Sequence, residues 1–372
     1  MKTHSTLSQT QHPVLRVLQL FLLVTLLASC NDSLSDRGQQ AARQVVLVAN
    51  EGNFTEGNGS ISWHDPEGDG TLQRRFEQVN QRPLGGIIQS ITRTESHLYI
   101  VTNSPNKIEK VSLPDLVHEQ TLLTEDPAIT PVKIAVASEN QAYVSSLYDH
   151  SVYRVDPESM TIESGAIATG NNPQEVLIHD RYLFVANNGF GEDETLSVID
   201  IDSDQTVETL TVGPGPLQME MDDAGKIWVL SAGRTAYDEN WNRVPEEDLP
   251  GRMDLVNPES LQVTDTIELE GQPSAFALDP RTGYAWVLGE NRIDRIGLDN
   301  LVLEQSDLPA RQFQTIGVSP WESRLFLGES RGYDQSGQVV IATPEGALID
   351  SFQVGIAPTE IEFMDLDSPE IQ

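Results

Sequence analysis

The sequence predicts an all-β fold, a seven-bladed β-propeller, and three observations support this prediction. A short apolar strand recurs seven times, mostly at intervals of 40 to 60 residues, which is typical of propeller blades. Each recurrence continues in the same order, with a polar loop, a second strand, a turn and a third strand. A lone strand at the carboxyl end has no partners of its own. The recurring strands begin near Val45, Leu98, Ala142, Tyr182, Ile227, Ala285 and Leu325.

The hairpin from Leu98 to Ser112, with the sequence LYIVTNSPNKIEKVS, shows the repeating unit in a simple form. Two strands rich in β-branched and aromatic residues flank Asn, Ser and Pro, which favour turns. Similar hairpins occur at QAYVSSLYDHSVYRVD, YLFVANNGFGEDETLSVID and KIWVLSAGR. We expect each of them to form the middle of one blade.

A corner rich in Gly, Asn and Pro leads into a further strand, as in TPVKIAV, NPQEVLI, GPLQMEM, QPSAFAL and APTEIEF. Proline fixes φ there and leaves no backbone donor that the next strand must pair. These strands alternate with period two, as Ile361 and Phe363 do, which predicts one packed face. We expect the packed faces of neighbouring blades to stack into the core, with no helix needed in the domain.

The strand from Thr359 to Asp365 is of this inner type but ends the chain without partners. The first unit, which starts at Val45, begins without an inner strand. We infer that the carboxyl-terminal strand completes the first blade and closes the ring, because an open ring would leave exposed strand edges.

Residues 1–29 have the features of a lipoprotein signal peptide. Lys2 and Arg16 precede the apolar run VLQLFLLVTLLA, which is too short to span a bilayer comfortably. The run ends at Leu-Ala-Ser-Cys, and Cys30 is the only cysteine in the chain. An exported protein gains little from one unpaired thiol. The alternative is an ordinary secretory signal with an accidental cysteine.

Leu-Ala-Ser-Cys resembles the bacterial lipobox, and this resemblance implies that Cys30 is the lipid attachment site and the first mature residue. Residues 30–43 are polar and lack an apolar period, so we expect a flexible lipid-anchored tether. The propeller is expected to span residues 44–366. Residues 367–372 are expected to form a polar tail.

The chain has 57 acidic and 23 basic residues, which gives a formal net charge of −34. Nucleic acid and anionic lipid would be repelled, so neither is expected as a partner. The acidic excess favours a surface adapted to salt, although Ca²⁺ binding would leave a similar composition. The best Ca²⁺ candidate is Asp200, Asp202 and Asp204, but Gln205 stands where an EF-hand needs glycine. We favour a solvated hairpin turn there and expect no cofactor and no metal site.

The letters of Tyr99 to Asn103 resemble the YVTN-type propeller repeat, in which such a strand is followed by a hairpin and a Gly-x-x-Pro corner. The resemblance covers roughly residues 44 to 365. It implies the fold more than the function, because proteins with this propeller fold have many unrelated functions.

A narrower likeness lies in VLVANEGNFTEGNGSISWHDPEG, from Val46 to Gly68, which looks like the opening blade of YncE-like surface lipoproteins. The BtuG-type members of that group capture cobalamin and pass it to a TonB-dependent outer-membrane receptor. The resemblance implies an outer-membrane lipoprotein that faces the cell exterior, a small-molecule or corrinoid ligand, and a receptor partner.

When the inner strand of each blade is counted as the first, the loops between second and third strands share one face of a propeller with the corners. This face surrounds the central channel, where ligand sites usually lie. Amides and aromatic rings in them suit a large, flat, neutral ligand edged with amides, such as a corrinoid. For any single Asn the alternative is a turn residue, because Asn tolerates positive φ. The candidate ligand-binding residues are Asn50, Asn53, Phe54, Asn103, Tyr148, His150, Asn172, Gln174, Asn187, Asn188, Phe190, Gln218, Arg234, Tyr237, Trp241, Asn242, Asn291, Arg292, Arg331 and Tyr333.

The fifth unit contains an insertion of about twenty residues, AGRTAYDENWNRVPEEDLPGR. Loops of this length are usually functional or disordered. Two large aromatics, Tyr237 and Trp241, argue against disorder. We therefore expect this loop to bind a ligand or a partner.

An enzyme is not expected, because the sequence lacks a Gly-x-Ser-x-Gly elbow, a phosphate loop and a His-Glu-x-x-His pair. YVTN-type relatives do include lactonase-like propellers, which need a polar cluster at the channel mouth. Residues that could supply such a cluster are Glu51, Glu175, Glu290, Arg292, Glu329 and Glu360.

Three functions therefore remain from the sequence. The first is a surface protein that binds a nutrient and delivers it to a TonB-dependent receptor. The second is an interaction scaffold of the cell surface or surface layer. The third is a propeller hydrolase.

Overall fold

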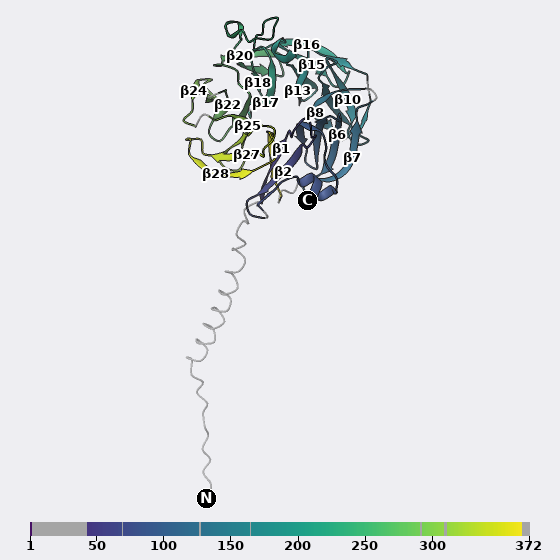
Figure 1. Ribbon diagram of the computed structural model, residues 1–372, viewed down its shortest axis with the longest axis vertical. Coiled ribbons are helices and arrows are strands. Elements are labelled where there is room, and N and C mark those ends of the chain that lie inside the picture. The colour runs from purple at the N-terminus through teal and green to yellow at the C-terminus, as the bar shows by residue number, and fades with distance from the viewer. Residues whose placement is uncertain are drawn as a thin grey trace. The chain divides into compact units, whose positions relative to one another are not determined.

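The protein is described by a computed structural model, which covers Met1 and residues 43–366 apart from residues 69, 126–127, 164, 291 and 309–310. The expected signal peptide, Cys30, the tether up to residue 42 and the polar tail lie outside these residues. Figure 1 shows seven small antiparallel sheets in a ring. Within the described ranges, no helix has the length and apolar character required to cross a membrane.

Each blade is one sheet, numbered here in chain order. Blade 1 contains β1 (Gln44–Asn50), β2 (Ser60–Asp65), β3 (Gly70–Leu72) and β29 (Pro358–Asp365). Blade 2 contains β4 (Ile87–Arg93), β5 (His97–Asn103), β6 (Lys107–Ser112) and β7 (Val117–Leu123). Blade 3 contains β8 (Pro131–Ser138), β9 (Gln141–Ser146), β10 (Ser151–Asp156), β11 (Thr161–Ile162) and β12 (Ile167–Ala168).

The remaining blades follow the same plan. Blade 4 contains β13 (Pro173–His179), β14 (Tyr182–Asn187), β15 (Thr195–Asp200) and β16 (Gln205–Thr211). Blade 5 contains β17 (Pro216–Met221), β18 (Ile227–Ser231), β19 (Arg252–Asn257) and β20 (Gln262–Glu268). Blade 6 contains β21 (Ala275–Asp279), β22 (Tyr284–Leu288), β23 (Ile293–Gly297) and β24 (Leu303–Gln305). Blade 7 contains β25 (Phe313–Val318), β26 (Leu325–Glu329), β27 (Gln338–Ala342) and β28 (Leu348–Gln353).

The predicted closure of the ring by the carboxyl-terminal strand is confirmed. β29 pairs antiparallel with β1, with Ile361 opposite Val48 and Glu360 opposite Ala49. It is the inner strand of blade 1, and it contacts β25 of blade 7 and β4 of blade 2. The first and last parts of the chain therefore share one sheet, and β29 covers the edge that β1 would otherwise expose.

The core lies between neighbouring blades, as the period-two pattern predicts. One buried cluster joins Tyr99 and Val101 of β5 to Ile134 of β8 and Val144 of β9. Equivalent clusters lie between the other blades. Stacking of sheet faces thus buries the apolar side chains without a helical layer.

The expectation of a domain without helices is wrong at one place. α2 (Arg75–Asn80) lies in the connection from blade 1 to blade 2, and it buries Phe76 completely. Phe76 packs in one cluster with Leu84 and Ile88. The helix therefore fills space that the short strand β3 leaves at the first blade. Two single 3₁₀ turns, η1 (Gly189–Gly191) and η2 (Pro245–Glu247), lie in loops.

The glycine that opens a Gly-x-x-Pro corner packs against the end of the second strand. A Cβ on Gly355 would lie 2.7 Å from Cγ of Asn50 and 2.6 Å from Oγ of Ser60. A Cβ on Gly170 would lie 2.6 Å from Nδ2 of Asn187. Real Cβ atoms do not approach other atoms so closely, so close approach explains glycine at these two positions.

Chain direction divides the ring into two faces. Each inner strand starts at its corner, so the corners and the loops between second and third strands lie at the same end of every blade; we call this end the loop face. Contacts between neighbouring loops support this arrangement, since Asn53 Nδ2 donates to the Tyr333 carbonyl at 2.7 Å. β1 starts at Gln44 on the opposite face, and β29 ends there at Asp365.

Candidate functional site

A bulge at the start of the inner strands directs polar side chains into the central channel. The register slips just after the corner in six of the seven blades, for example between Pro173 and Glu175 and between Pro216 and Gln218. Bulges re-aim side chains and are frequent near functional sites. Glu175, Gln218 and Glu360 each follow such a bulge in the same register.

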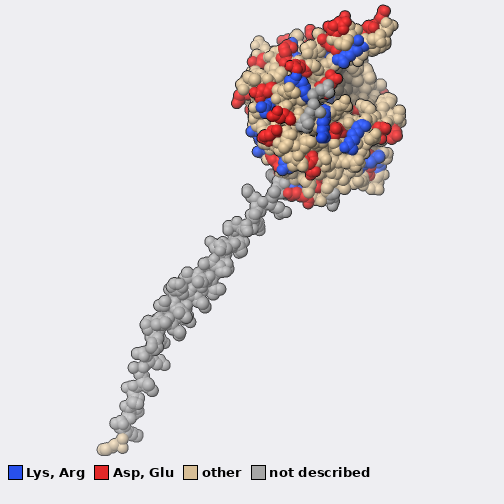
Figure 2. Space-filling model, turned by 60° about the vertical axis from the view of Figure 1, so that its left-hand side comes forward, with Lys and Arg blue, Asp and Glu red and all other residues tan. Residues whose placement is uncertain are grey.

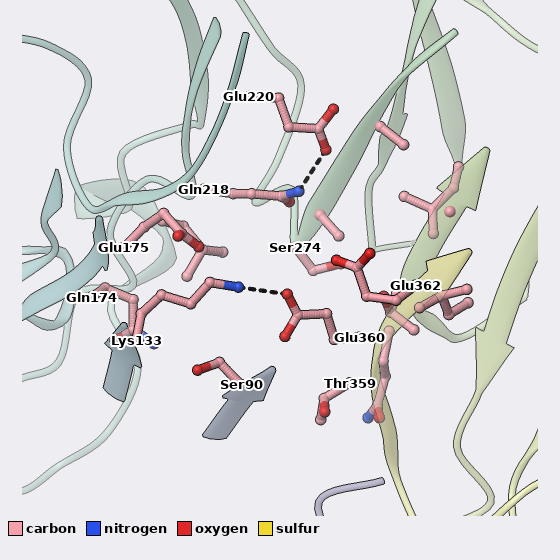
Figure 3. A pocket seen from close by; sticks show the side chains of 18 of the residues that line it. Ser90, Lys133, Gln174, Glu175, Gln218, Glu220, Ser274, Thr359, Glu360 and Glu362 are labelled. Carbon is pink, nitrogen blue, oxygen red and sulfur yellow. Dashed lines mark hydrogen bonds and ion pairs between the residues drawn. The ribbon is translucent and has the colours of Figure 1, made fainter. Parts of the chain in front are cut away.

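The channel contains a cavity of about 350 Å³ that is lined by the inner strands. Figure 3 shows one cationic side chain and four carboxylates that point into this space. The charged lining residues are Lys133, Glu175, Glu220, Glu360 and Glu362. Two amide residues named from the sequence, Gln174 and Gln218, also line it.

Several of these side chains bind the exposed backbone edge of a neighbouring inner strand. The Gln218 side chain accepts from the Phe276 amide at 3.0 Å and donates to the Phe276 carbonyl at 2.9 Å. Glu220 Oε2 accepts from the Leu278 amide at 3.0 Å. Ser90 Oγ donates to the Val132 carbonyl at 2.6 Å. Inner strands have an unpaired edge at the axis, so these bonds satisfy buried backbone groups.

Glu175 and Glu362 do not bind the backbone of a neighbouring inner strand among the described residues. Glu175 accepts only from the next residue in the chain, the Val176 amide at 3.2 Å, among the bonds found in the described ranges. Glu362 Oε2 lies 3.8 Å from Arg93 Nε. The Glu362 side chain is 31 % exposed and lines the channel cavity. Both carboxylates are therefore available to an incoming group.

Burial raises the pKa of three channel carboxylates. Desolvation is the main cause, and it raises the pKa of Glu175, Glu220 and Glu362 to about 7. The ammonium of Lys133 opposes the shift at Glu175 and Glu362, whereas the nearby Glu360 carboxylate adds to it. These groups therefore exchange protons near neutral pH, which is the range required of a general acid or base.

The loop face carries the second candidate site. The exposed aromatic side chains found in the described part of the chain all come from loops between second and third strands. Trp241 is 83 % exposed and Phe54 is 74 % exposed. The complete set is Phe54, Tyr148, Phe190, Tyr237, Trp241 and Tyr333, which we call the aromatic set. All six were named from the sequence.

The insertion in blade 5 is an ordered loop that presents two members of the aromatic set. In Figure 1 it is the green loop that projects beyond the ring beside β18 and β20. The Asp238 carboxylate accepts from the amides of Asn240 and Asn242, both at 2.8 Å, and from the Asn242 side chain at 3.0 Å. Trp241 has φ +62°, a left-handed conformation that is rare for a bulky residue. Its ring lies 6.2 Å from that of Tyr237.

The base of the insertion is tied to the loop of blade 4. Arg234 Nη1 lies 3.3 Å from Glu192 Oε2. A smaller cavity of about 290 Å³ lies between the two loops, and Gly191, Asp193 and Leu249 are among its lining residues. Phe190, next to Gly191, is also left-handed, with φ +55°.

Other candidates on the loop face hold the loops together. Asn50 and Asn187 are fully buried and donate within their own hairpins, to Ser62 Oγ at 3.1 Å and Ser197 Oγ at 3.0 Å. Asn172 Nδ2 donates to the Leu147 carbonyl at 2.8 Å, and His150 Nδ1 accepts from the Asn172 amide at 3.0 Å. Any contribution of the buried Asn50, Asn172 and Asn187 to binding would be indirect, whereas His150 is exposed.

The remaining candidates are scattered along the same face. Arg292 pairs with Asp294 and Glu270. Arg331 donates to Gln338 at 2.6 Å, and Asn188 donates to the Pro216 carbonyl at 3.3 Å. Asn103 ends β5, and its buried Oδ1 has no hydrogen-bond partner among the described residues. Asn291 lies outside the described residues.

The possible Ca²⁺ run is occupied by protein contacts. Asp200 accepts from the amide of Asp202 at 3.0 Å and pairs with Arg181. Asp204 accepts from the Tyr143 hydroxyl at 2.5 Å. In the described ranges, no group of three or more His, Cys, Asp or Glu side chains is arranged to hold a metal ion.

Sequence reasoning missed Lys133, Glu220 and Glu362. The signal was present, because these residues occupy the positions that alternate with the packed residues of the inner strands. The period that predicts the packed face also predicts which side chains line the channel.

Comparisons with known proteins agree on the fold. No protein-family model matches the sequence, and no curated protein matches it. A quinoprotein alcohol dehydrogenase-like protein from Bacteroides thetaiotaomicron has a TM-score of 0.64 at 12 % identity, over 87 % of this chain and 78 % of the other. The periplasmic gluconolactonase of Pseudomonas aeruginosa has a TM-score of 0.61 at 14 % identity, over 86 % and 98 %.

The hydrazine synthase of Kuenenia stuttgartiensis has a TM-score of 0.59 at 16 % identity, over 73 % of this chain and 88 % of the other. The chain is a seven-bladed β-propeller. Its structural neighbours lie in the quinoprotein and lactonase propeller class. At these identities the likeness concerns the fold, and function must be argued from the sites.

Proposed function

We propose that this propeller is a surface-anchored binding protein that captures a small nutrient on its loop face, with a corrinoid as the best candidate. The observation that supports this proposal is the position of the aromatic set, six exposed rings on loops of a single face. Large exposed aromatics are unfavourable in water, and their concentration on one face marks an interaction surface. Rings give contact area at a small entropic cost and suit flat ligands.

The chemistry of the loop face favours a large, largely neutral ligand with polar edges. Amide and hydroxyl groups lie beside the rings, for example Asn242 beside Trp241 in the insertion. On the side of the molecule that Figure 2 shows, acidic and basic side chains are interleaved and do not gather into one basic patch. A polyanionic ligand would meet a chain with a net charge of −34. A corrinoid, flat and edged with amides, fits this description.

The direction of the chain is compatible with a lipid anchor. The propeller begins at β1 on the face opposite the loops, so an anchor at Cys30 would attach upstream of that opposite face. The aromatic set lies on the other face of the propeller, away from the point where the chain enters β1. Delivery to a TonB-dependent receptor in the same membrane is part of the proposal, and the tether of residues 30–43 would allow the reorientation that delivery needs.

Equilibrium dialysis tests this function directly. The propeller, which belongs to a compact unit that starts at Arg43, would be dialysed against cyanocobalamin and against cobinamide, and bound ligand measured by visible absorbance. We expect retention of both corrinoids. If neither is retained at micromolar protein, corrinoid capture is refuted, and an interaction scaffold for protein or glycan becomes the leading function.

A hydrolase is the second candidate, and the channel carboxylates favour it. Glu175 and Glu362 line one cavity, bind no backbone group of a neighbouring inner strand among the described residues, and have pKa values near 7. A gluconolactonase is among the structural neighbours. Turnover of a lactone that disappears in Glu175→Gln and Glu362→Gln variants would support this candidate. Turnover that is unchanged in both variants would exclude the channel.

A further inference from the structure

Three side chains form a hydrogen-bonded chain on the face opposite the loop face. Ser96 lies in the turn between β4 and β5, His97 begins β5, and Glu119 lies on β7. Ser96 Oγ is 2.8 Å from His97 Nδ1, and His97 Nε2 is 3.1 Å from Glu119 Oε2. Nucleophile, base and orienting carboxylate are thus within bonding reach of one another, which is the arrangement that activates a serine.

The turn that holds Ser96 is fixed on both sides. The Thr94 amide donates to the His97 carbonyl at 2.9 Å, and the His97 amide donates to Thr94 Oγ1 at 3.1 Å. The Ser96 carbonyl accepts from the Leu113 amide at 2.8 Å. These backbone bonds keep the serine hydroxyl beside the imidazole without relying on its own side-chain bond.

The carboxylate sets the tautomer of the ring. When Nε2 carries the proton and donates to Glu119, Nδ1 is left as the acceptor of the Ser96 hydroxyl proton. The two ring nitrogens are exchanged relative to the usual serine hydrolase triad, but the roles are the same. Burial and Lys110 lower the pKa of His97, while Glu119 raises it, with a net shift downward. The imidazole is therefore neutral, and able to accept a proton, at neutral pH.

A cavity of about 610 Å³ adjoins this chain, between blades 2 and 3. Ser96 and His97 both line it, and so does Lys110, the one cationic residue among its lining side chains. Lys110 Nζ is 3.8 Å from Glu119 Oε2 and is also held by the Pro157 carbonyl at 3.1 Å. The other titratable side chains that face the cavity are Glu95, Tyr99, Glu139 and Glu158.

We propose that Ser96 is the nucleophile of an acyl-transfer site that acts on small neutral or cationic esters. Ser96 Oγ attacks the ester carbonyl while its proton passes to His97 Nδ1, and the leaving alkoxide takes that proton. Water then attacks the acyl-serine, His97 again accepts a proton, and a carboxylic acid leaves with Ser96 restored. Lys110, which lines the same cavity, would supply positive charge for the developing oxyanion. The carboxylates around the cavity disfavour anionic esters.

An active-site phosphonylation experiment tests this proposal. The propeller is incubated with an alkyl fluorophosphonate, which forms an O–P bond with an activated serine and releases fluoride, and the modified peptide is mapped by mass spectrometry. We expect a single adduct on Ser96. His97→Asn and Glu119→Gln should each slow labelling by at least about tenfold. Labelling should rise with pH through a midpoint below the usual histidine pKa of about 6.5.

Ser138 is the internal control, because it lines the same cavity but its Oγ bonds to Asn140 at 2.8 Å instead of to a histidine. Equal labelling of Ser96 and Ser138, no labelling of Ser96, or full labelling in folded His97→Asn protein would each overturn the proposal. Circular dichroism of both variants establishes that they are folded. The result does not depend on corrinoid binding, which concerns the other face.

Discussion

The Lys133 ammonium and the Glu360 carboxylate meet at 2.5 Å inside the channel, although the residues are 227 positions apart. Both also bind Ile91 on the strand between them: Lys133 Nζ donates to its carbonyl at 3.0 Å, and Glu360 Oε2 accepts from its amide at 2.7 Å. The inner strands of blades 1, 2 and 3 are thus clamped together at the point where β29 closes the ring.

Breaking this clamp should destabilise the whole propeller. Lys133→Met leaves the Glu360 carboxylate without its cation in a confined site, so we expect a loss of about 2 to 4 kcal/mol in the free energy of unfolding. Denaturant unfolding measures it. The double variant Lys133→Met/Glu360→Gln should recover at least half of the loss, because it removes the stranded charge.

The more exposed pair of Arg295 and Glu304, at 2.9 Å, is the control for the clamp. Arg295→Met should cost less than about 1 kcal/mol, because solvent screens exposed pairs. Equal losses for Lys133→Met and Arg295→Met would show that the clamp has no special role in closure.

The corner glycines should be intolerant of a methyl group. Gly355→Ala places a Cβ within 2.7 Å of Asn50 and Ser60, both of which are buried. We expect it to lower the free energy of unfolding by about 1 to 3 kcal/mol. Gly165→Ala is the control, since among the described residues no atom other than those of its chain neighbours lies within 4 Å of the added Cβ, and it should change stability by less than about 0.5 kcal/mol.

The channel carboxylates should make the protein less stable as pH rises toward neutrality. Glu175, Glu220 and Glu362 have pKa values of about 7 in the folded state, against about 4.3 for an unfolded chain. Between these values the folded state binds more protons, so their contribution falls as pH rises from about 4.5 to about 7. Unfolding measured across this range should show that slope, and the triple Gln variant should flatten it. An unchanged slope in that variant would contradict the assignment.

The insertion loop should depend on Asp238 for order but not for global stability. Asp238→Ala removes the acceptor that organises the amides of Asn240 and Asn242. We expect the fluorescence anisotropy of Trp241 to fall in a background in which the other tryptophans are replaced, with a melting temperature that is nearly unchanged. Glu239→Ala, which removes the neighbouring exposed carboxylate, should leave the anisotropy as it was. Equal anisotropy in both variants would mean that Asp238 does not order the loop.

The fold could be predicted from the sequence because the same pattern of strands and turns repeats along the chain. The seven second strands lie within the ranges expected from the strand starts, and the unpartnered strand near Thr359 predicted the closure. Helix α2 could not be predicted in this way, because it occurs once and depends on the packing of Phe76 into the cluster beside the first blade.

The site was accessible only in part. The aromatic set followed from loop position, since all six rings are exposed on one face. Asn50 and Asn187 looked equivalent to surface amides, but the corner glycines of other segments cover them, and sequence does not show what lies over a hairpin end. Lys133 and Glu360 lie on strands that are far apart in the sequence, so no local pattern predicts that they pair.

Calorimetric titration with cyanocobalamin measures whether the aromatic set binds the ligand. Unmodified propeller, Tyr237→Ala/Trp241→Ala, and Val207→Ala on the outer strand β16 would be compared; Val207 is exposed but lies away from the loops. We expect saturable binding, at least about tenfold weaker in the double variant and unchanged in Val207→Ala. Binding of equal strength in the double variant, or no heat from the unmodified propeller, would contradict it.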